Sequence, residues 1–233
     1  MTTTGQTAMR PQAIVSLLIR DIDLSYALFM VSKSKPSIKR RTSIGSRRNP
    51  EAEAAVLAAA KELIWEKGYA GFSVDEVARR AGSGKTTIYR WYPTKADLFV
   101  AIYTAERSAF VPVPNTGNLV EDLVQYTESL WRFWASHPAG AALRGLIAEA
   151  QGTSEALGAL RDKFLPERTA DVRQMLSSAA GRGEFPYEHV DEKLSLWVGF
   201  SWFRLLIGEL HQADTIRLAM TQIAALAIPR PPE

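Results

Sequence analysis

The stretch SVDEVARRAGSGKTTIYRWYPTK, residues 73–95, decides the fold of the first half of the chain. Ser73 and Glu76 have the spacing of a capping box ahead of an apolar run, which predicts the start of a short helix. Gly82 ends this helix, and Ser83 is placed to cap a second one. Two short helices joined by a tight glycine-containing turn are typical of a helix-turn-helix.

The sequence GSGKTT inside this stretch also resembles the phosphate-binding loop of an ATPase. That loop requires G-x-x-x-x-G-K-[ST] after a strand and before a helix. Gly84, Lys85 and Thr86 supply its second half, but Arg79 stands where the first glycine belongs. The preceding VDEVARR has the pattern of a capped helix, so the backbone amides cannot wrap a triphosphate. The helix-turn-helix interpretation, in which the second helix enters the DNA major groove, is therefore favoured.

The chemistry of residues 83–95 suits a nucleic acid, because the segment contains three basic residues and no acidic one. Hydroxyl and basic side chains at the start of a helix can donate to phosphates and base edges. The alternative is that Ile88 and the aromatic residues only fill a small core. Ile88 does have the position of a core residue, but this alternative leaves the absence of acids unexplained.

The longer run AAKELIWEKGYAGFSVDEVARRAGSGKTTIYRWYPTKADLF, residues 59–99, is similar to the DNA-binding domain of the TetR family of bacterial regulators. The resemblance covers residues 49–103 without a gap. It includes the A-x-x-A-G turn, the K-x-T-[IL]-Y-x-x-[FY] recognition helix and the start of the next helix. Ser83 and Gly84 depart from the family pattern, which often has a small apolar residue and then serine.

The resemblance implies roles for individual side chains. Base-edge contacts fall on Thr86, Thr87 and Arg90, and phosphate contacts fall on Lys85, Tyr89 and Lys95. Trp91 and Tyr92 are expected to be divided between core packing and phosphate packing. The complete predicted DNA-contact set is Ser73, Ser83, Gly84, Lys85, Thr86, Thr87, Tyr89, Arg90, Trp91, Tyr92 and Lys95.

A basic segment precedes this domain. Residues 31–48 hold seven basic residues and no acidic one, and are too polar to fold alone. A solvated tail that aids solubility is one interpretation, and an arm that follows the DNA minor groove is the other. The helix-turn-helix downstream favours the arm, with candidate contacts from Lys39, Arg40, Arg41, Arg47 and Arg48.

Residues 1–30 form an extension of a different kind. A short apolar stretch there is interrupted by Arg20, Asp21 and Asp23 and lacks the order of a signal peptide. Met30 stands directly before the basic segment. We therefore hypothesise that this extension lies outside the functional unit and that translation starts at Met30.

Composition excludes several classes of protein. The 233 residues are 46% hydrophobic and 23% charged, with no apolar run near the roughly 20 residues of a membrane-spanning helix. Cysteine is absent and the three histidines lie far apart, so neither thiol chemistry nor a metal site is expected. The sequence has no nucleophile elbow and no paired catalytic carboxylates. We expect no cofactor, no enzyme activity and a cytoplasmic location.

The remainder of the chain has helical periodicity, so the predicted class is all-α. We expect a DNA-binding domain over 49–110, with its helix-turn-helix at about 73–92, and a ligand-binding and dimerisation domain over 115–228. The latter loosely resembles a TetR-family C-terminal subfamily through ALRGLIAEAQ, RDKFLPERTADVRQML and SLWVGFSWFRLLIGEL. Residues 194–210 are apolar nearly all round, as expected for a helix buried on both sides in a homodimer.

A ligand pocket is harder to predict, because an aromatic stripe at helical spacing is more often plain core. The candidate pocket residues are Trp131, Trp134, His137, Arg144, Trp197, Trp202 and Arg204. Family resemblance then implies a transcriptional regulator, most often a repressor, that binds a palindromic DNA operator as a homodimer. A small-molecule effector would favour a spacing of the recognition helices that no longer fits the operator.

Overall fold

The computed structural model of the chain describes residues 49–211 and 213–227, and every regular element in these ranges is a helix. The all-α prediction is confirmed. The basic segment and the N-terminal extension lie outside the described residues, so the predictions made for them stay predictions. None of the helices in the described ranges has the length and apolar character needed to cross a membrane.

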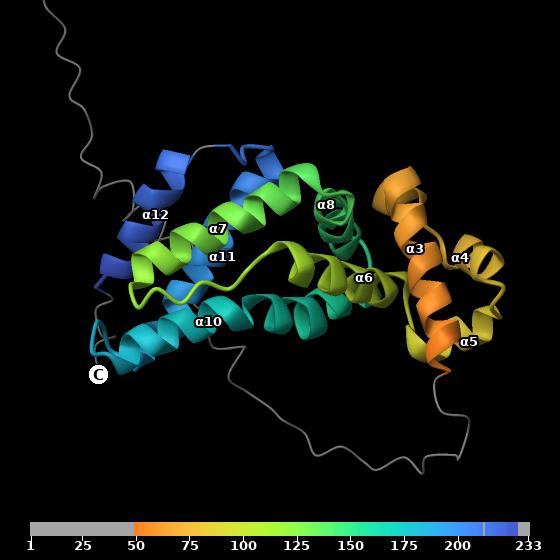
Figure 1. Cartoon of the computed structure of the whole chain (residues 1–233), viewed down its shortest axis with the longest axis horizontal. Coiled ribbons are helices and arrows are strands. Elements are labelled where there is room, and N and C mark those ends of the chain that lie inside the picture. The colour runs from red at the N-terminus through yellow and green to blue at the C-terminus, as the bar shows by residue number, and fades with distance from the viewer. Residues whose placement is uncertain (1–48, 212, 228–233) are drawn as a thin grey trace, which may run out of the picture. The chain divides into compact units, whose positions relative to one another are not determined.

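The N-terminal part consists of α3 (Pro50–Gly71), α4 (Val74–Ala81), α5 (Lys85–Trp91) and α6 (Lys95–Phe110) (Figure 1). α3 begins with a capped turn: the side chain of Asn49 accepts from the amide of Glu51 at 3.1 Å, and Pro50 occupies the first turn. Gly68 interrupts the regular helix with φ 63°, a conformation that favours glycine.

The helix-turn-helix forms with two local differences from the sequence prediction. Ser73 caps α4 by accepting from the Glu76 amide at 3.3 Å, but the Glu76 carboxylate binds Arg79 and Arg80 in place of the cap amide. Two arginines one turn further along outcompete a single backbone amide for this carboxylate. Gly84, and not Ser83, is the N-cap of α5.

Gly82 carries the turn between the two helices, as predicted. It adopts the left-handed conformation, with φ 60°, at the C-cap of α4. Ser83 and Gly84, which follow, both belong to the turn. α5 therefore starts at Lys85, one residue later than a cap at Ser83 would place it. Arg79, at the position where a phosphate-binding loop needs glycine, lies on α4 and pairs with Glu76 at 2.7 Å.

The C-terminal part is built from helices that pack on one another, and α7, α8 and η1 of this part also contact α6 (Figure 1). In chain order these are α7 (Leu119–Ser136), α8 (Pro138–Ala150), α9 (Ser154–Gly158), the π-helical η1 (Ala159–Phe164), α10 (Leu165–Gly181), the short η2 (Tyr187–His189), α11 (Val190–Ile207) and α12 (Ala213–Ala225).

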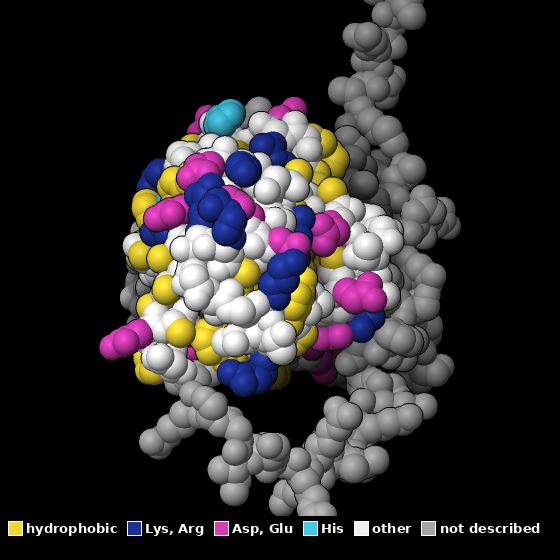
Figure 2. Space-filling view, turned by 90° about the vertical axis from the view of Figure 1, so that its right-hand side faces the viewer, with side chains coloured by type: hydrophobic (Ala, Val, Ile, Leu, Met, Phe, Trp, Pro, Cys, Tyr) yellow, Lys and Arg dark blue, Asp and Glu magenta, His cyan; other side chains and the backbone are white. Residues whose placement is uncertain are grey.

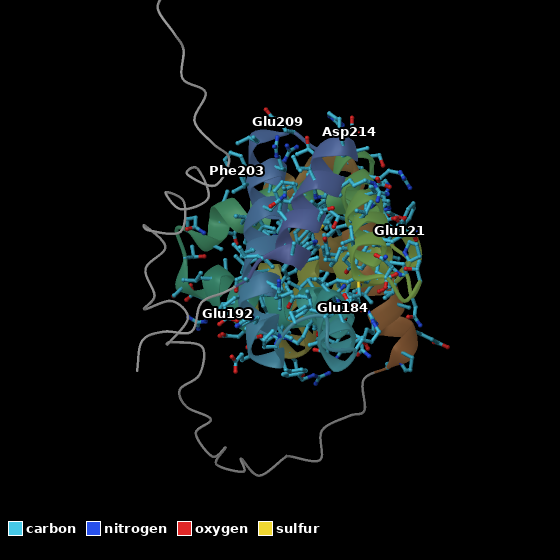
Figure 3. The ribbon with its side chains drawn as sticks, turned by 90° about the vertical axis from the view of Figure 1, so that its left-hand side faces the viewer. Glu121, Glu184, Glu192, Phe203, Glu209 and Asp214 are labelled. Carbon is cyan, nitrogen blue, oxygen red and sulfur yellow. The ribbon has the colours of Figure 1, made fainter. Side chains whose placement is uncertain are left out.

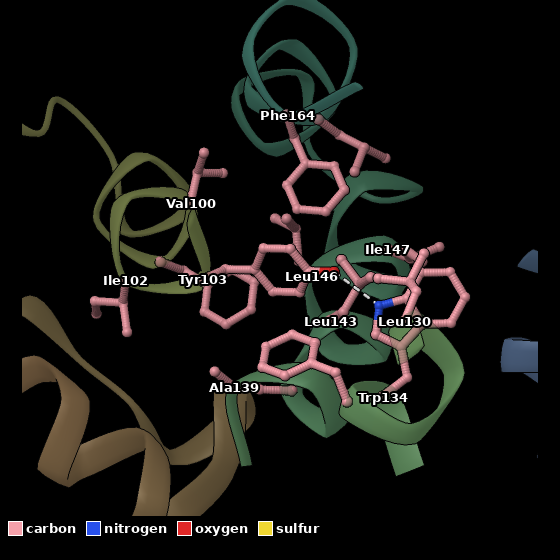
Figure 4. Close-up of a cluster of buried hydrophobic side chains, with 14 of the residues drawn as sticks. Val100, Ile102, Tyr103, Leu130, Trp134, Ala139, Leu143, Leu146, Ile147 and Phe164 are labelled. Carbon is pink, nitrogen blue, oxygen red and sulfur yellow. Dashed lines mark hydrogen bonds between the residues drawn. The ribbon is translucent and has the colours of Figure 1, made fainter. Parts of the chain in front are cut away.

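The N-terminal and C-terminal parts share one hydrophobic core. α8 packs along α3, and Gly145 makes the close approach possible, because a Cβ at this position would lie 2.7 Å from Cβ of Tyr69. α6 also joins the two parts. Its first turn follows α5, and Tyr103 near its middle packs against the rings of Phe133 and Phe164. Figure 4 shows this cluster, including the 2.7 Å hydrogen bond from Trp134 to Tyr103.

α12 is held on α11 by a buried lysine. The ammonium group of Lys193 donates to the carbonyl oxygens of Ile223, Ala224 and Leu226 at 2.7, 3.0 and 2.9 Å. These carbonyls lie at the C-terminal end of α12, where a helix leaves acceptors unsatisfied and favours positive charge. The lysine therefore fixes how the last two helices lie against each other.

Candidate DNA interface and ligand pocket

α5 has two chemically different faces. Ile88 and Trp91 are 0% and 8% exposed and anchor the helix in the core. On the opposite side Lys85, Thr86, Tyr89 and Arg90 are all exposed, and Tyr89 retains 45% of its surface. Residues one helical turn apart lie on the same face, so the hydroxyl and basic groups form one polar surface.

Trp91 and Tyr92 belong to the core in this structure. Both are buried, and the Tyr92 hydroxyl donates to the carboxylate of Glu53 on α3 at 2.8 Å. This bond ties the end of the helix-turn-helix to the first turn of α3. A phosphate contact from either residue stays a prediction.

The remaining predicted contacts lie around the turn. Ser73 and Gly84 are exposed, whereas Ser83 and Thr87 are half-buried. The Ser73 oxygen already accepts from the Glu76 amide, but its hydroxyl hydrogen remains available to donate. The structure thus brings the predicted residues close together in the helix-turn-helix and the start of α6, with Trp91 and Tyr92 on its buried side.

Acidic side chains accompany the basic ones at this end. Figure 2 shows Lys and Arg intermixed with Asp and Glu on the side formed by α3, α4 and α5. The ammonium group of Lys85 lies 2.8 Å from the Asp75 carboxylate, and that of Lys95 lies 3.2 Å from Glu149. Exposed ion pairs of this kind are weak, so a phosphate can replace either carboxylate.

The Lys95 contact connects the start of α6, next to the helix-turn-helix, to α8. Glu149 on α8 accepts from the Tyr69 hydroxyl at 3.2 Å with one oxygen and binds Lys95 with the other. The ammonium group also lies 4.2 Å from the centre of the Tyr69 ring. Burial and the neighbouring Glu149 raise the pKa of Tyr69, so its hydroxyl remains a donor. The three side chains come from α3, α6 and α8.

A small cavity of about 20 Å³ lies in the C-terminal part, with room for about one water molecule. Three predicted pocket residues, Trp134, Trp197 and Trp202, line it. Two arginines, Arg107 of α6 and Arg168 of α10, lie in the same wall. The lining comes from α6, α7, η1, α10 and α11.

Four predicted pocket residues are elsewhere. Trp131 is buried and stacks on Phe200 with ring centres 5.5 Å apart. His137 packs among aromatic rings where α7 meets α8, and Arg144 is exposed on α8. Arg204 forms an ion pair with Glu209.

Arg107, Arg168 and Tyr103 also line the cavity and were not predicted from the sequence. Arg107 is 5% exposed and donates to the Tyr126 hydroxyl and the Asp171 carboxylate. A weak signal was available: Arg107 lies one turn after Tyr103, on the same apolar face of α6. An arginine in such a stripe is compatible with a solvent-exposed head group, so the pattern alone does not predict burial.

An exposed apolar surface lies on the last two helices. Figure 3 shows Phe203 on the outer side of α11, directed away from the ribbon. Its exposure is 58%, and Leu206, Ile207 and Leu218 are 53%, 48% and 64% exposed. Large apolar side chains gathered on one surface mark an interaction site.

Fold and site together define a class of protein, a helix-turn-helix transcriptional regulator with a helical C-terminal domain. Residues 56–102 match the model of the bacterial regulatory proteins of the tetR family. Residues 113–222 match the tetracyclin repressor-like C-terminal domain. The chain belongs to the TetR family.

Individual relatives agree with this assignment. The uncharacterized HTH-type transcriptional regulator YdeS of Bacillus subtilis is 32% identical over 165 residues, which cover 70% of this chain and 82% of YdeS. The DNA-binding transcriptional repressor TetR of Mycobacteroides abscessus is 33% identical over 138 residues, covering 59% and 72%. The solved TetR family transcription regulator SCO0332 is 29% identical with TM-score 0.65, covering 77% and 100%.

The family assignment sets the broad function. TetR-family proteins bind operator DNA and small-molecule ligands as dimers, and they are regulators rather than enzymes. Among the described residues no group of His, Cys, Asp and Glu side chains has the arrangement of a metal site. The predicted class of function, a DNA-binding transcriptional regulator, is confirmed.

Proposed function

We propose that this chain is a homodimeric repressor that binds a palindromic operator and leaves it when a small molecule binds the C-terminal domain. The proposed domains are 49–110 for DNA binding, with the helix-turn-helix at about 73–92, and 115–228 for ligand binding and dimerisation. Lys39, Arg40, Arg41, Arg47 and Arg48 are proposed to follow the minor groove. The cytoplasm, where the DNA lies, is the proposed location.

The two-faced character of α5 is the observation that carries the DNA assignment. Its exposed side offers hydroxyl groups and a guanidinium group, which are the donors that read base edges. Its buried side anchors the helix in the core next to α4, so the exposed donors are held in place before DNA arrives. We assign base contacts to Thr86, Thr87 and Arg90, and phosphate contacts to Lys85, Tyr89 and Lys95.

The exposed apolar surface on α11 and α12 supports the homodimer. Phe203, Leu206 and Ile207 have the three- and four-residue spacing of one face of α11, and Leu218 is exposed on the neighbouring α12. A symmetric pair of such surfaces would bury them in a helix bundle. Two recognition helices related by a two-fold axis then require two half-sites, which is why a palindromic operator is proposed.

The experiment that tests DNA binding is selection of operator sites from random duplex DNA by the full chain. We expect enrichment of an inverted repeat. The double variant Thr86→Ala with Arg90→Ala should lose the enrichment, because base contacts specify sequence. Arg144→Ala, an exposed change on α8, is the matched control. Failure of the native chain to enrich any sequence would contradict the proposal.

The dimer has a separate test. Phe203→Glu places a charge in the centre of the proposed interface, and sedimentation should then report a monomer. Gln174→Glu, which adds a charge on the exposed side of α10 and outside this surface, is the control. A native chain that sediments as a monomer at micromolar concentration would contradict the proposed assembly.

A further inference from the structure

The cavity between α6, α10 and α11 has an unusual balance of charge. Arg107 is compensated, because it donates to the Asp171 carboxylate and to the Tyr126 hydroxyl. Tyr126 in turn donates to Asp171 at 3.1 Å. One carboxylate therefore serves one guanidinium group and one phenol, and has little capacity for a second cation.

Arg168 is the second cation and is poorly compensated. One of its terminal nitrogens donates to Glu167 at 3.3 Å, but that carboxylate is 57% exposed and lies on the solvent side. The other two nitrogens, Nε and Nη1, are buried and have no hydrogen-bond partner among the described residues. Burial, followed by the nearby charge of Arg107, lowers the pKa of Arg168. A buried donor on a charged group that lacks an acceptor costs free energy.

The rest of the lining is mainly apolar and aromatic. Tyr103, Trp134, Phe164, Trp197 and Trp202 contribute rings, so the cavity presents cationic donors on one side and flat apolar walls on the others. Figure 4 shows three of these residues, with Tyr103 and Trp134 joined by their hydrogen bond and Phe164 beside them. An inorganic anion would accept hydrogen bonds from the donors, but it has no apolar surface that could pack against the aromatic walls.

We infer that this cavity binds a small organic carboxylate with an aromatic body, with the carboxylate accepting from the unpartnered Nη1 of Arg168 and the ring lying among the tryptophan side chains. The inference rests on the proposed function, since it names the chemical class of the effector. A guanidinium donor forms its strongest hydrogen bonds with an ionised acceptor such as a carboxylate, and Nη1 of Arg168 has no acceptor among the described residues. A few oriented polar groups in an apolar pocket is the usual composition of a ligand site.

The cavity must enlarge to admit such a molecule, because about 20 Å³ holds only a water. The outer wall is the part that can yield: Arg168, Thr169, Val198 and Trp202 are partly exposed, whereas Tyr103, Arg107 and Phe164 are buried. η1, directly before α10, is π-helical, and such segments often mark functional sites in helices. Opening therefore separates α10 from α11 and changes the contacts of Arg107 on α6.

Direct binding to the native chain tests the ligand class without DNA. Titration calorimetry with benzoate, indole-3-carboxylate and 1-naphthoate should give binding of at least one acid, with quenching of tryptophan fluorescence. Its neutral amide should bind about 10- to 100-fold more weakly, because it loses the charge-assisted pair. Equal affinity of acid and amide, stronger binding of inorganic phosphate, or no binding of any acid below millimolar concentration would overturn the inference.

Variants test the position of the site. Arg168→Met keeps the length of the side chain and should lose the preference for acid over amide, while Arg144→Met, the arginine first expected as an anchor, should keep it. Arg168→Gln serves if the first variant does not fold. A preference lost in Arg144→Met and kept in Arg168→Met would overturn the assignment.

Release of a selected operator separates this inference from the proposed function. An acid that binds and also releases DNA supports both. If a neutral molecule releases the operator and no acid binds, the inference fails and the repressor model stands. An acid that binds at Arg168 without releasing DNA supports the site and contradicts ligand control through it.

Discussion

α5 and the C-terminal cavity use similar side chains for opposite purposes. Arg90 on α5 is exposed with aromatic neighbours, and its charge is available to another molecule. Arg107 at the cavity is 5% exposed and its charge is already matched within the chain. The two sites differ in how their residues are distributed along the sequence. Those of α5 are seven consecutive residues, whereas those of the cavity come from five separate elements. A local motif predicts the first kind of site, and only packing creates the second.

The largest expected effect separates these two arginines. Arg107→Leu leaves Asp171 and Tyr126 without their cation, and breaking a partly buried ionic group in this way costs about 3–5 kcal/mol. Arg90→Leu, the control on an exposed surface, should change stability by no more than about 0.5 kcal/mol. Urea denaturation followed by circular dichroism measures both. Similar small changes in the two variants would show that the Arg107 cluster adds little to folding.

Adjacent residues of α5 allow a second comparison within one helix. Ile88→Ala removes a fully buried side chain and should cost about 2–4 kcal/mol of stability. Tyr89→Ala should leave stability nearly unchanged and weaken DNA binding across sequences by roughly tenfold, because it removes a hydrogen bond to a charged phosphate. Thermal unfolding and band-shift titration report the two properties. A Tyr89→Ala variant with native DNA affinity would remove this residue from the interface.

These two regions also explain what the sequence could predict. Capping residues and glycine turns are local, so Ser73 and Gly82 placed the two ends of α4 correctly. Ser83 failed as a cap because the turn after Gly82 needs two residues, a difference that spacing alone does not reveal. At the level of the fold, local chemistry was sufficient.

The cavity depended on contacts that no local pattern encodes. The tryptophans were found because large aromatic side chains are few, and Trp134, Trp197 and Trp202 do meet at the cavity. Arg144 and Arg204 were chosen as anchors for their charge, yet Arg144 is exposed and Arg204 pairs with Glu209. Which arginine becomes buried depends on how α6 and α10 pack, and this packing is known only from the three-dimensional structure.

A smaller effect is expected where the two regions meet. Glu149→Gln weakens the hold of α8 on Lys95, so this lysine can turn to a DNA phosphate without first leaving an ion pair. We expect DNA affinity to rise by a few-fold, corresponding to at most about 1 kcal/mol for an ion pair that is partly exposed. Band-shift titration at several salt concentrations measures the change.

Two further variants make the Lys95 comparison specific. Glu155→Gln on α9 is the matched control and should bind DNA as the native chain does. Lys95→Ala should weaken DNA binding, reduce the slope of log affinity against log salt by about 1, and abolish the gain from Glu149→Gln. A gain that persists in the double variant would mean that Glu149 acts only through its general negative charge.

The smallest expected effect concerns pH and lies where α7 meets α8. The His137 ring stacks on Phe133, with centres 4.7 Å apart, and meets the edge of Trp65 at 4.9 Å. Glu106 approaches Nε2 at 3.4 Å, and Lys61 on α3 binds the same carboxylate group. Burial lowers the pKa of His137 below its ordinary value of 6.5, and this outweighs the attraction of Glu106.

The sign of the pH dependence follows from that lowered pKa. As pH falls through about 6.5 the unfolded chain takes up the proton first, so His137 makes the folded state progressively less stable until the folded imidazole is also protonated. Unfolding midpoints in urea from pH 7.5 to 5 should therefore fall more steeply in the native chain than in His137→Phe, which keeps an aromatic ring and cannot titrate. His211→Phe, which removes an exposed imidazole, is the control. If both variants flatten the slope equally, the burial of His137 is not the cause.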